Sequence, residues 1–133
     1  MIKEIMNEKI DAKGYSPLAL AYIGDCIFEL LVRTMLVKKE NKQVYKYHKE
    51  AVKYVKASAQ ASISKSIEHM LSEEEIAVFK RGRNSKSKPP KNADTLEYKY
   101  ATGFEALIGY LYLKGDMERI YKIVDEGIKE LDV

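Results

Sequence analysis

Residues 17–37 read PLALAYIGDCIFELLVRTMLV, and this stretch decides the fold class. Ser16 followed by Pro17 is typical of a helix start, because Ser caps the first turn and Pro fits the first helical position. Apolar residues occupy nearly every side of the predicted helix, which is typical of a central and largely buried helix. We therefore predict an α-helix from Pro17 to about Val37 at the centre of the protein.

The rest of the chain also predicts helices and no strand. It contains no clean alternation of apolar and polar residues, and no Asn-Gly or Asp-Gly turn. Ser72 and Glu75 form a capping-box pattern, and Gly115 followed by Asp116 separates two helices. The expected helices run from about Lys42 to Met70 with a break within 57–66, from Ser72 to about Gly82, from about Thr95 to Leu113, and from Asp116 to about Leu131. The predicted fold class is all-α.

Length and composition indicate one folded domain over residues 1–133. The chain is 46% hydrophobic and 32% charged, which argues against disorder. Its single cysteine, Cys26, excludes an internal disulfide and favours a reducing compartment. The start of the chain does not resemble a signal peptide, and no apolar run approaches the roughly 18 residues of a membrane span. We expect a cytoplasmic protein without a membrane partner.

The net charge of +3 hides an uneven distribution. Residues 38–56 carry seven lysines and two glutamates, and residues 80–91, KRGRNSKSKPPK, carry six positive charges and no acid. These two segments together hold +11, whereas the rest of the chain sums to −8. Such an asymmetry indicates a surface that binds a polyanion.

The first basic segment is expected to form a helix with lysines on one face. The spacing alternates between four and three residues, as helical neighbours require, for Lys42, Lys46, Lys49, Lys53 and Lys56. An apolar face that should be buried is formed by Val44, Tyr47, Ala51, Val55 and Ala59. A solvated helix face is the alternative interpretation of the lysines.

The second basic segment is expected to form a loop, because Gly82, Pro89 and Pro90 interrupt it. Its charged side chains suit the phosphates of a nucleic acid. They are Arg81, Arg83, Lys86, Lys88 and Lys91. The alternative interpretation is an unstructured surface loop.

Two carboxylates stand alone on apolar helices. Asp25 has only Ala21 and Glu29 one turn away, and Glu105 is the only charge in ATGFEALIGYLYL, residues 101–113. Burying a carboxylate is costly unless it is paired, hydrogen-bonded or bound to a metal. Two such groups could share a divalent cation, and Mg²⁺ accepts few carboxylates while leaving room for water and phosphate oxygens. A Mg²⁺ ion beside a basic surface is suited to phosphodiester hydrolysis.

Structural roles are the alternative for these acids. Asp25 could cap another helix, and Glu105 could pair with a buried Arg or Lys. Glu29 can pair with Arg33 along its own helix. Cysteine and histidine offer no competing metal chemistry, since Cys26 is expected to pack as a small apolar residue. The chain contains no Ser-His-Asp pattern, P-loop or GxGxxG motif.

Several short motifs resemble those of the ribonuclease III family. Residues 21–29, AYIGDCIFE, are similar to the signature helix of its endonuclease domain, and residues 102–109, TGFEALIG, are similar to its second acidic motif. The supporting pieces fall in the family's order and spacing, and they are Tyr54-Val55, Ala59-Gln60-Ala61 and Arg81-Gly82-Arg83-Asn84. The resemblance spans about residues 15–120. Within the family it is to Mini-ribonuclease III, the bacterial branch made of the catalytic domain alone.

This resemblance implies a helical bundle like the ribonuclease III endonuclease domain, in a homodimer that cuts double-stranded RNA. It implies Mg²⁺ as cofactor, with Mn²⁺ as a substitute, and products with a 5′-phosphate and a 3′-hydroxyl. It implies maturation of the 23S ribosomal RNA precursor, with a ribosomal protein as a candidate further partner. It assigns Asp25 and Glu105 as catalytic metal ligands, and it assigns the loop from Arg81 to Lys91, including Asn84, as an RNA contact.

The chain departs from ordinary ribonuclease III in three respects. That enzyme has further acids four residues before the signature Asp and three before the second-motif Glu, where this chain has Ala21 and Thr102. Fewer protein ligands would leave more of the metal shell to water and RNA. A length of 133 residues leaves no room for a double-stranded-RNA-binding domain, so the catalytic domain itself should hold the RNA.

Weaker assignments complete the prediction. Lys53 and Lys56 are expected to contact RNA. Glu29 and Thr102 are expected to lie next to the metal ligands and position them without binding the metal themselves. Two other functions stay open. One is a non-catalytic RNA-binding or ribosome-associated module on the same fold, suggested by Ala21 and Thr102. The other is a helical protein–protein adaptor.

Overall fold

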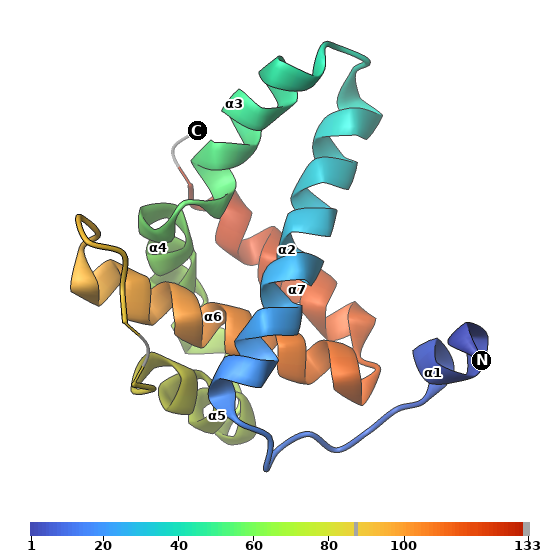
Figure 1. The fold of residues 1–133 in the computed structure, drawn as a ribbon, viewed down its shortest axis with the longest axis vertical. Helices are drawn as coiled ribbons and strands as arrows, with labels where there is room; N and C mark the ends of the chain where they lie inside the picture. The colour runs from blue at the N-terminus through green and yellow to red at the C-terminus, as the bar shows by residue number, and fades with distance from the viewer. Residues whose placement is uncertain (87, 132–133) are drawn as a thin grey trace.

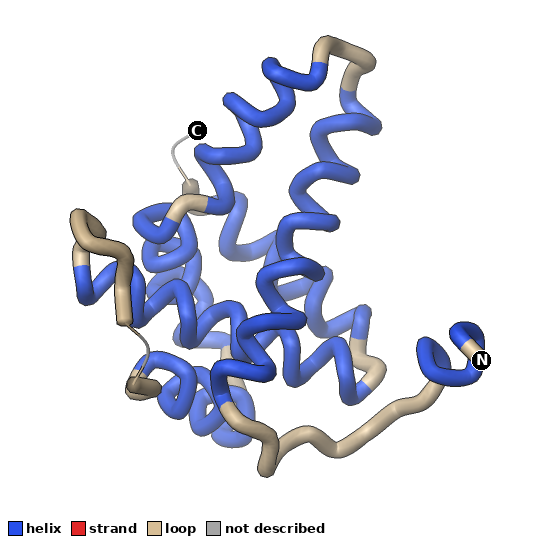
Figure 2. Tube along the Cα trace, in the orientation of Figure 1, coloured by secondary structure: helices blue, strands red, loops and turns tan. Residues whose placement is uncertain are grey.

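The computed structural model describes residues 1–86 and 88–131 (Figure 1). Its described part contains helices and no strand, as Figure 2 shows, so the predicted all-α fold class is confirmed. In chain order the elements are α1 (Ile2–Asn7), α2 (Pro17–Lys39), α3 (Val44–Val55), α4 (Ala57–Ile67), the 3₁₀ helix η1 (Glu68–Met70), α5 (Glu73–Arg83), α6 (Thr95–Lys114) and α7 (Met117–Lys129). No helix in this part of the chain is long and apolar enough to cross a membrane.

The predicted helix ends are confirmed by their caps. The Ser16 hydroxyl accepts a hydrogen bond from the Ala19 amide at 3.1 Å, so α2 begins at Pro17 as expected. Ser72 and Glu75 form a complete capping box that starts α5. Gly115 follows α6 with a φ of 85°, which is the left-handed geometry that favours glycine at this position.

Two boundaries differ from the prediction. The expected break within 57–66 lies instead at Lys56, whose ψ of 155° interrupts the helix, and residues 57–66 are helical. The freed carbonyl of Val55 accepts a hydrogen bond from the Gln60 side chain at 2.8 Å, which stabilises the break. The basic loop also starts later than predicted, because α5 continues to Arg83.

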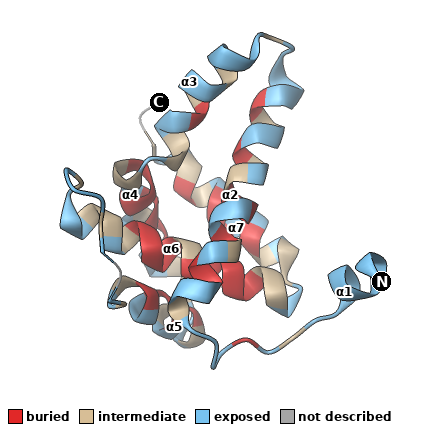
Figure 3. Cartoon of the chain, in the orientation of Figure 1, coloured by how far each residue is buried: buried red, intermediate tan, exposed pale blue. Residues whose placement is uncertain are grey.

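The central helix is α6. It packs against α2, α4, α5 and α7, and every residue from 101 to 111 except Glu105 is buried (Figure 3). Its Phe104 ring meets Phe28 of α2 edge-to-face, with 5.1 Å between the ring centroids. The prediction that the 17–37 helix is central is therefore wrong.

The α2 helix is apolar on two opposite sides, of which only one faces the core. Leu20, Phe28 and Val32 are buried against the rest of the bundle. The other side is exposed, with Tyr22 at 84% and Leu30 at 58% exposed. A helix that is apolar all round can therefore have one face in the core and the other available to a partner.

Two glycines bring α2 and α6 into backbone contact. A Cβ atom on Gly24 of α2 would lie 1.7 Å from the carbonyl oxygen of Glu105, and one on Gly109 of α6 would lie 1.9 Å from that of Leu20. Both distances are far below any van der Waals contact. The two glycines therefore allow a helix crossing that no other residue would permit, directly beside Asp25 and Glu105.

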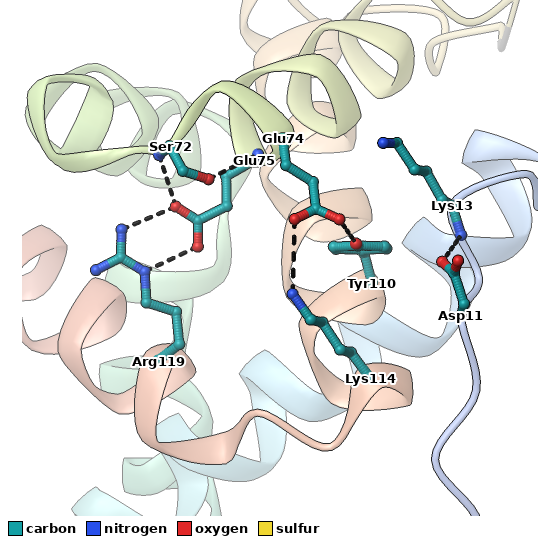
Figure 4. A network of polar contacts seen from close by, with 8 residues as sticks. All are labelled: Asp11, Lys13, Ser72, Glu74, Glu75, Tyr110, Lys114 and Arg119. Atoms are coloured by element: carbon teal, nitrogen blue, oxygen red, sulfur yellow. Dashed lines mark hydrogen bonds and ion pairs between the residues drawn. The ribbon is translucent and has the colours of Figure 1, made fainter.

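Polar contacts fasten α5 to its neighbours (Figure 4). The Arg119 guanidinium of α7 donates two hydrogen bonds of 2.8 Å to the buried Glu75 carboxylate, and a third of 2.6 Å to the Met70 carbonyl. Arg119 holds the pKa of Glu75 below its ordinary value. Tyr110 of α6 donates a hydrogen bond to Glu74 of α5. These contacts fix the frame on which α6 presents Glu105.

The predicted faces of the lysine-rich helix are partly wrong. Ala51 is buried as expected, whereas Val44 is exposed. Lys42 precedes α3. Its ammonium group already forms ion pairs, because it lies 2.7 Å from Glu50 and 3.7 Å from Glu40. Lys53 and Lys56 are exposed, so these two remain available to a ligand.

Candidate active site

A cavity of about 700 Å³ opens between α2 and α6. The lone carboxylates of both helices line it, so the structure brings Asp25 and Glu105 together as predicted. The remaining lining residues are Leu18, Ala21, Tyr22, Ile23, Cys26, Glu29, Tyr98 and Thr102. Cys26 is exposed at this surface, contrary to the expectation that it packs as a small apolar residue.

Asp25 and Glu105 differ in their surroundings. Asp25 is exposed, which removes the burial cost expected for it, whereas Glu105 is half-buried. Burial, followed by the charge of Asp25 and a hydrogen bond with it, raises the pKa of the Glu105 carboxyl group to about 8. Ionised together, the two carboxylates would repel one another at close range. The pair therefore favours either a proton or a cation between its members.

Gln60 of α4 supports Glu105 from inside the protein. Its side chain is 3% exposed, and its amide nitrogen lies 2.8 Å from the Val55 carbonyl and 3.4 Å from a Glu105 carboxylate oxygen. This contact lowers the pKa of Glu105 and so opposes the effect of burial. The resemblance included Gln60, but sequence reasoning gave it no role, because its contact with Glu105 crosses 45 residues.

The weaker site assignments also lie at the cavity. Glu29 pairs with Arg33 along α2, as predicted, and remains at the cavity wall. Thr102 is buried, and its hydroxyl donates a 3.0 Å hydrogen bond to the Tyr98 carbonyl. Tyr98 itself lines the cavity one helical turn away, although no sequence pattern singled it out.

The basic residues of 80–91 differ in their contacts, and not all of them are free to bind a ligand. The Arg81 guanidinium donates hydrogen bonds to the backbone carbonyls of Lys13 and Tyr15, so this side chain fastens the segment before α2. The Arg83 guanidinium donates a 3.2 Å hydrogen bond to the Asn84 side chain at the end of α5. Exposed loop cations beyond them are Lys86, Lys88 and Lys91.

The raised pKa of Glu105 predicts a pH effect on stability. Folding raises this pKa from 4.5 to about 8, so between these values the unfolded chain has lost a proton that the folded chain keeps. The contribution of Glu105 to the free energy of unfolding should therefore fall by about 1.4 kcal/mol per pH unit as the pH rises through this range. Thermal denaturation in EDTA should show the native chain losing about 3 kcal/mol relative to Glu105→Gln between about pH 5.5 and 7.5. Parallel pH profiles would contradict this assignment.

Comparison with known proteins shows the family of the chain. The family model of the ribonuclease III domain matches residues 18–116, which include α2 from its second residue and the whole of α6. This chain belongs to the ribonuclease III family. A protein named Mini-ribonuclease 3 from Thermoanaerobacter sp. (strain X514) is 50% identical over 118 residues, covering 88% of this chain and 83% of the relative.

Further relatives place the chain in the same branch of the ribonuclease III family. A Mini-ribonuclease 3 from Clostridium tetani is 48% identical, covering 87% of this chain and 78% of the relative. A crystal structure of a protein from Fusobacterium nucleatum superposes with a TM-score of 0.82 at 36% identity, covering 91% of this chain and 99% of that one. The resemblance to Mini-ribonuclease III and the predicted fold are therefore confirmed, and the chain is an endoribonuclease.

The donor set fits the divalent metal on which the ribonuclease III family generally depends. Asp25 and Glu105 supply carboxylate oxygens, and among the residues that the structure describes no Lys, Arg or His forms an ion pair with Glu105. Within the described residues, no group of three or more His, Cys, Asp or Glu side chains has the geometry of a metal site. An ion here would rest on two protein carboxylates and complete its shell with water and substrate oxygens, as Mg²⁺ commonly does.

Proposed function

We propose that this endoribonuclease cleaves double-stranded RNA at the cavity between α2 and α6, with Asp25 and Glu105 as ligands of Mg²⁺ or of Mn²⁺ in its place. The observation that carries the proposal is the meeting of these two carboxylates from facing helices in one cavity. The bound ion would supply activation of a water molecule and stabilisation of charge on the leaving oxygen.

The protein's own residues would orient the reaction. Attack of the water oxygen on phosphorus and breakage of the bond to the 3′ oxygen would leave a 5′-phosphate and a 3′-hydroxyl. Gln60 and the buried surroundings hold the Glu105 carboxylate at one position, while Gly24 keeps Asp25 beside it. Such fixed positioning reduces the reorganisation that the transition state requires.

Product analysis tests this function directly. We expect the native chain to cut a perfect RNA duplex with Mg²⁺, to leave single-stranded RNA of the same sequence intact, and to be inactive with EDTA. Duplex binding without cleavage in Mg²⁺ would instead agree with the non-catalytic RNA-binding module that Ala21 and Thr102 suggested, and the absence of both binding and cleavage would agree with the adaptor function.

The basic loop after α5 is proposed to grip the duplex through its phosphates. A-form RNA exposes phosphates and 2′-hydroxyls in a wide minor groove, so cations recognise its shape more than its base sequence. Arg83 and Asn84 end the helix at the start of this loop, and Lys53 and Lys56 at the end of α3 are exposed cations outside it. Arg81 is assigned mainly to fastening the chain, because its guanidinium already binds two carbonyls.

Removing the loop cations should weaken RNA binding in a salt-dependent way. The triple variant Lys86→Gln, Lys88→Gln and Lys91→Gln should lower the slope of log affinity against log salt by up to about 0.9 for each lost phosphate contact. Filter binding to a short RNA duplex in EDTA measures this slope without cleavage. If the triple variant kept the native salt slope, the loop would not be part of the RNA interface.

We also propose that the enzyme acts as a homodimer through the exposed face of α2. Apolar side chains recur every four residues there, at Leu18, Tyr22 and Leu30, with Cys26 between them. An exposed apolar stripe on an otherwise packed helix is typical of an interface. Since Leu18 and Tyr22 also line the cavity, a second copy of the chain bound there would form part of the active-site wall. A twofold dimer would place one active site at each strand of the RNA duplex.

A charge on this stripe should separate the subunits. Leu30 is exposed and does not line the cavity, so Leu30→Glu should leave the fold intact and shift sedimentation from dimer to monomer. Lys122→Glu on α7 is the matched control, since this side chain is also exposed. A native chain that sediments as a monomer yet cuts both strands of a duplex together would contradict the dimer.

The natural substrate is proposed to be the 23S ribosomal RNA precursor, with a ribosomal protein assisting cleavage. The support is the resemblance to Mini-ribonuclease III together with the high identity to proteins of that name. A transcript of the precursor's paired ends should be cut at a discrete position, with a rate that rises when ribosomal protein is added. Uniform cleavage of any duplex at the same rate would contradict this substrate assignment.

A further inference from the structure

One aromatic ring outside the cleavage cavity gathers two cations from separate helices. The Lys65 ammonium of α4 lies 5.3 Å from the ring centroid of Tyr100 on α6, and the Arg83 guanidinium carbon of α5 lies 5.9 Å from it. The buried Phe79 ring packs against Tyr100 with 5.9 Å between centroids, so the ring is held in place. Cation–π attraction positions both charges without neutralising them.

These two cations have no acidic partner among the residues that the structure describes. Within the described residues, no carboxylate lies within ion-pair distance of Lys65 or Arg83, whereas Lys42, Lys114 and Arg119 all have one. Two like charges near one ring repel each other, and an anion between or beside them relieves that repulsion. Arg and Lys together are the residue types that bind phosphate oxygens.

We infer that Lys65, Tyr100 and Arg83 form a phosphate-binding site for the RNA backbone, separate from the cleavage cavity. None of the three residues lines that cavity. Tyr100 lies five residues before Glu105 on α6, which corresponds to about 7.5 Å along the helix axis and about 140° around it. The site therefore lies on a different side of α6 from Glu105, where it would hold a phosphate other than the cleaved one and help to set the register of the duplex.

The position of Arg83 makes this site continuous with the proposed RNA surface. Arg83 is the last residue of α5, and the basic loop follows it directly. Lys65 extends that surface onto α4, a helix that the charge pattern of the sequence did not implicate. Because the inference rests on the proposed action on duplex RNA, its test must separate the two.

The test measures binding of a short RNA duplex in EDTA as a function of salt. Lys65→Gln should weaken binding about tenfold at low salt and reduce the salt slope by about 0.9, the loss of one phosphate contact. Lys122→Gln on α7 is the control and should match the native chain. Lys65→Arg should restore the native slope, since it keeps the charge.

Variants of Tyr100 distinguish a positioning role from a merely structural one. Tyr100→Phe keeps the ring face and should keep the native salt slope, whereas Tyr100→Leu should lower it as Lys65→Gln does. Thermal midpoints identify any variant that fails to fold, and Lys65→Gln at the exposed position should retain the native midpoint. A folded Lys65→Gln with the native slope would overturn this inference alone. A native chain that does not bind the duplex at all would overturn the proposed function itself.

Discussion

Asp25→Asn and Glu105→Gln are each expected to lower the rate of duplex cleavage by at least about a thousandfold. Each removes one of the two protein carboxylates proposed to hold the metal, and metal stabilisation of transition-state charge contributes several kcal/mol. The fold should survive both changes. Asp25 is exposed, and replacing half-buried Glu105 by a neutral amide removes a group whose ionisation destabilises the folded chain near neutral pH.

The measurement is the single-turnover rate at saturating Mg²⁺, with thermal midpoints recorded on the same samples. Glu118→Gln is the matched control, because it removes an exposed carboxylate from α7 outside the cavity. Glu29→Gln should lie between the control and the two ligand variants, since Glu29 lines the cavity but pairs with Arg33. Native rates for a folded Asp25→Asn variant would exclude Asp25 as a metal ligand.

Gly24→Ala is expected to have the second large effect, on both stability and activity. The added Cβ would meet the Glu105 carbonyl oxygen at 1.7 Å, so α2 and α6 must move apart where the two carboxylates meet. Overpacking of this kind costs about 1–3 kcal/mol or more, because the obstacle is backbone and cannot rotate away. We expect a thermal midpoint lower by several degrees and a cleavage rate reduced more than the loss of folded protein explains.

Gly14→Ala provides the control for this variant. Among the described parts of the chain, a Cβ atom at Gly14 meets nothing within 4 Å, so the same chemical change should leave stability and cleavage unaffected. Gly109→Ala should reproduce the defect from the opposite helix, since its Cβ would lie 1.9 Å from the Leu20 carbonyl oxygen. A native midpoint for Gly24→Ala would show that the two helices are not held by this contact.

The sequence was sufficient to predict features that depend on interactions within a few residues of the chain. Ser16, Ser72 and Gly115 each determine a helix end through hydrogen bonds or backbone geometry within a few residues, and the structure confirms all three. The isolation of Asp25 and Glu105 among apolar residues was also visible, although the burial cost expected from it applies only to Glu105, because Asp25 is exposed.

Features that depend on which helices pack together could not be predicted from the sequence. The apolar surface of the 17–37 helix suggested that it is largely buried, but periodicity cannot distinguish a core face from an exposed apolar face. The contact between Gln60 and Glu105, and the gathering of Lys65 and Arg83 on Tyr100, join residues from different helices. Arg81 appeared to be a free cation, although its partners are backbone carbonyls, which no sequence pattern reveals.

Binding of Mn²⁺ to the RNA-free protein is the most direct test that Asp25 and Glu105 together hold a divalent ion. The electron paramagnetic resonance signal of free Mn²⁺ should fall when the native chain is added and should return when Mg²⁺ displaces the bound ion. The double variant Asp25→Asn and Glu105→Gln should leave the free Mn²⁺ signal unchanged, while Glu118→Gln should bind as the native chain does. Equal uptake of Mn²⁺ by the folded double variant and the native chain would contradict the proposed site.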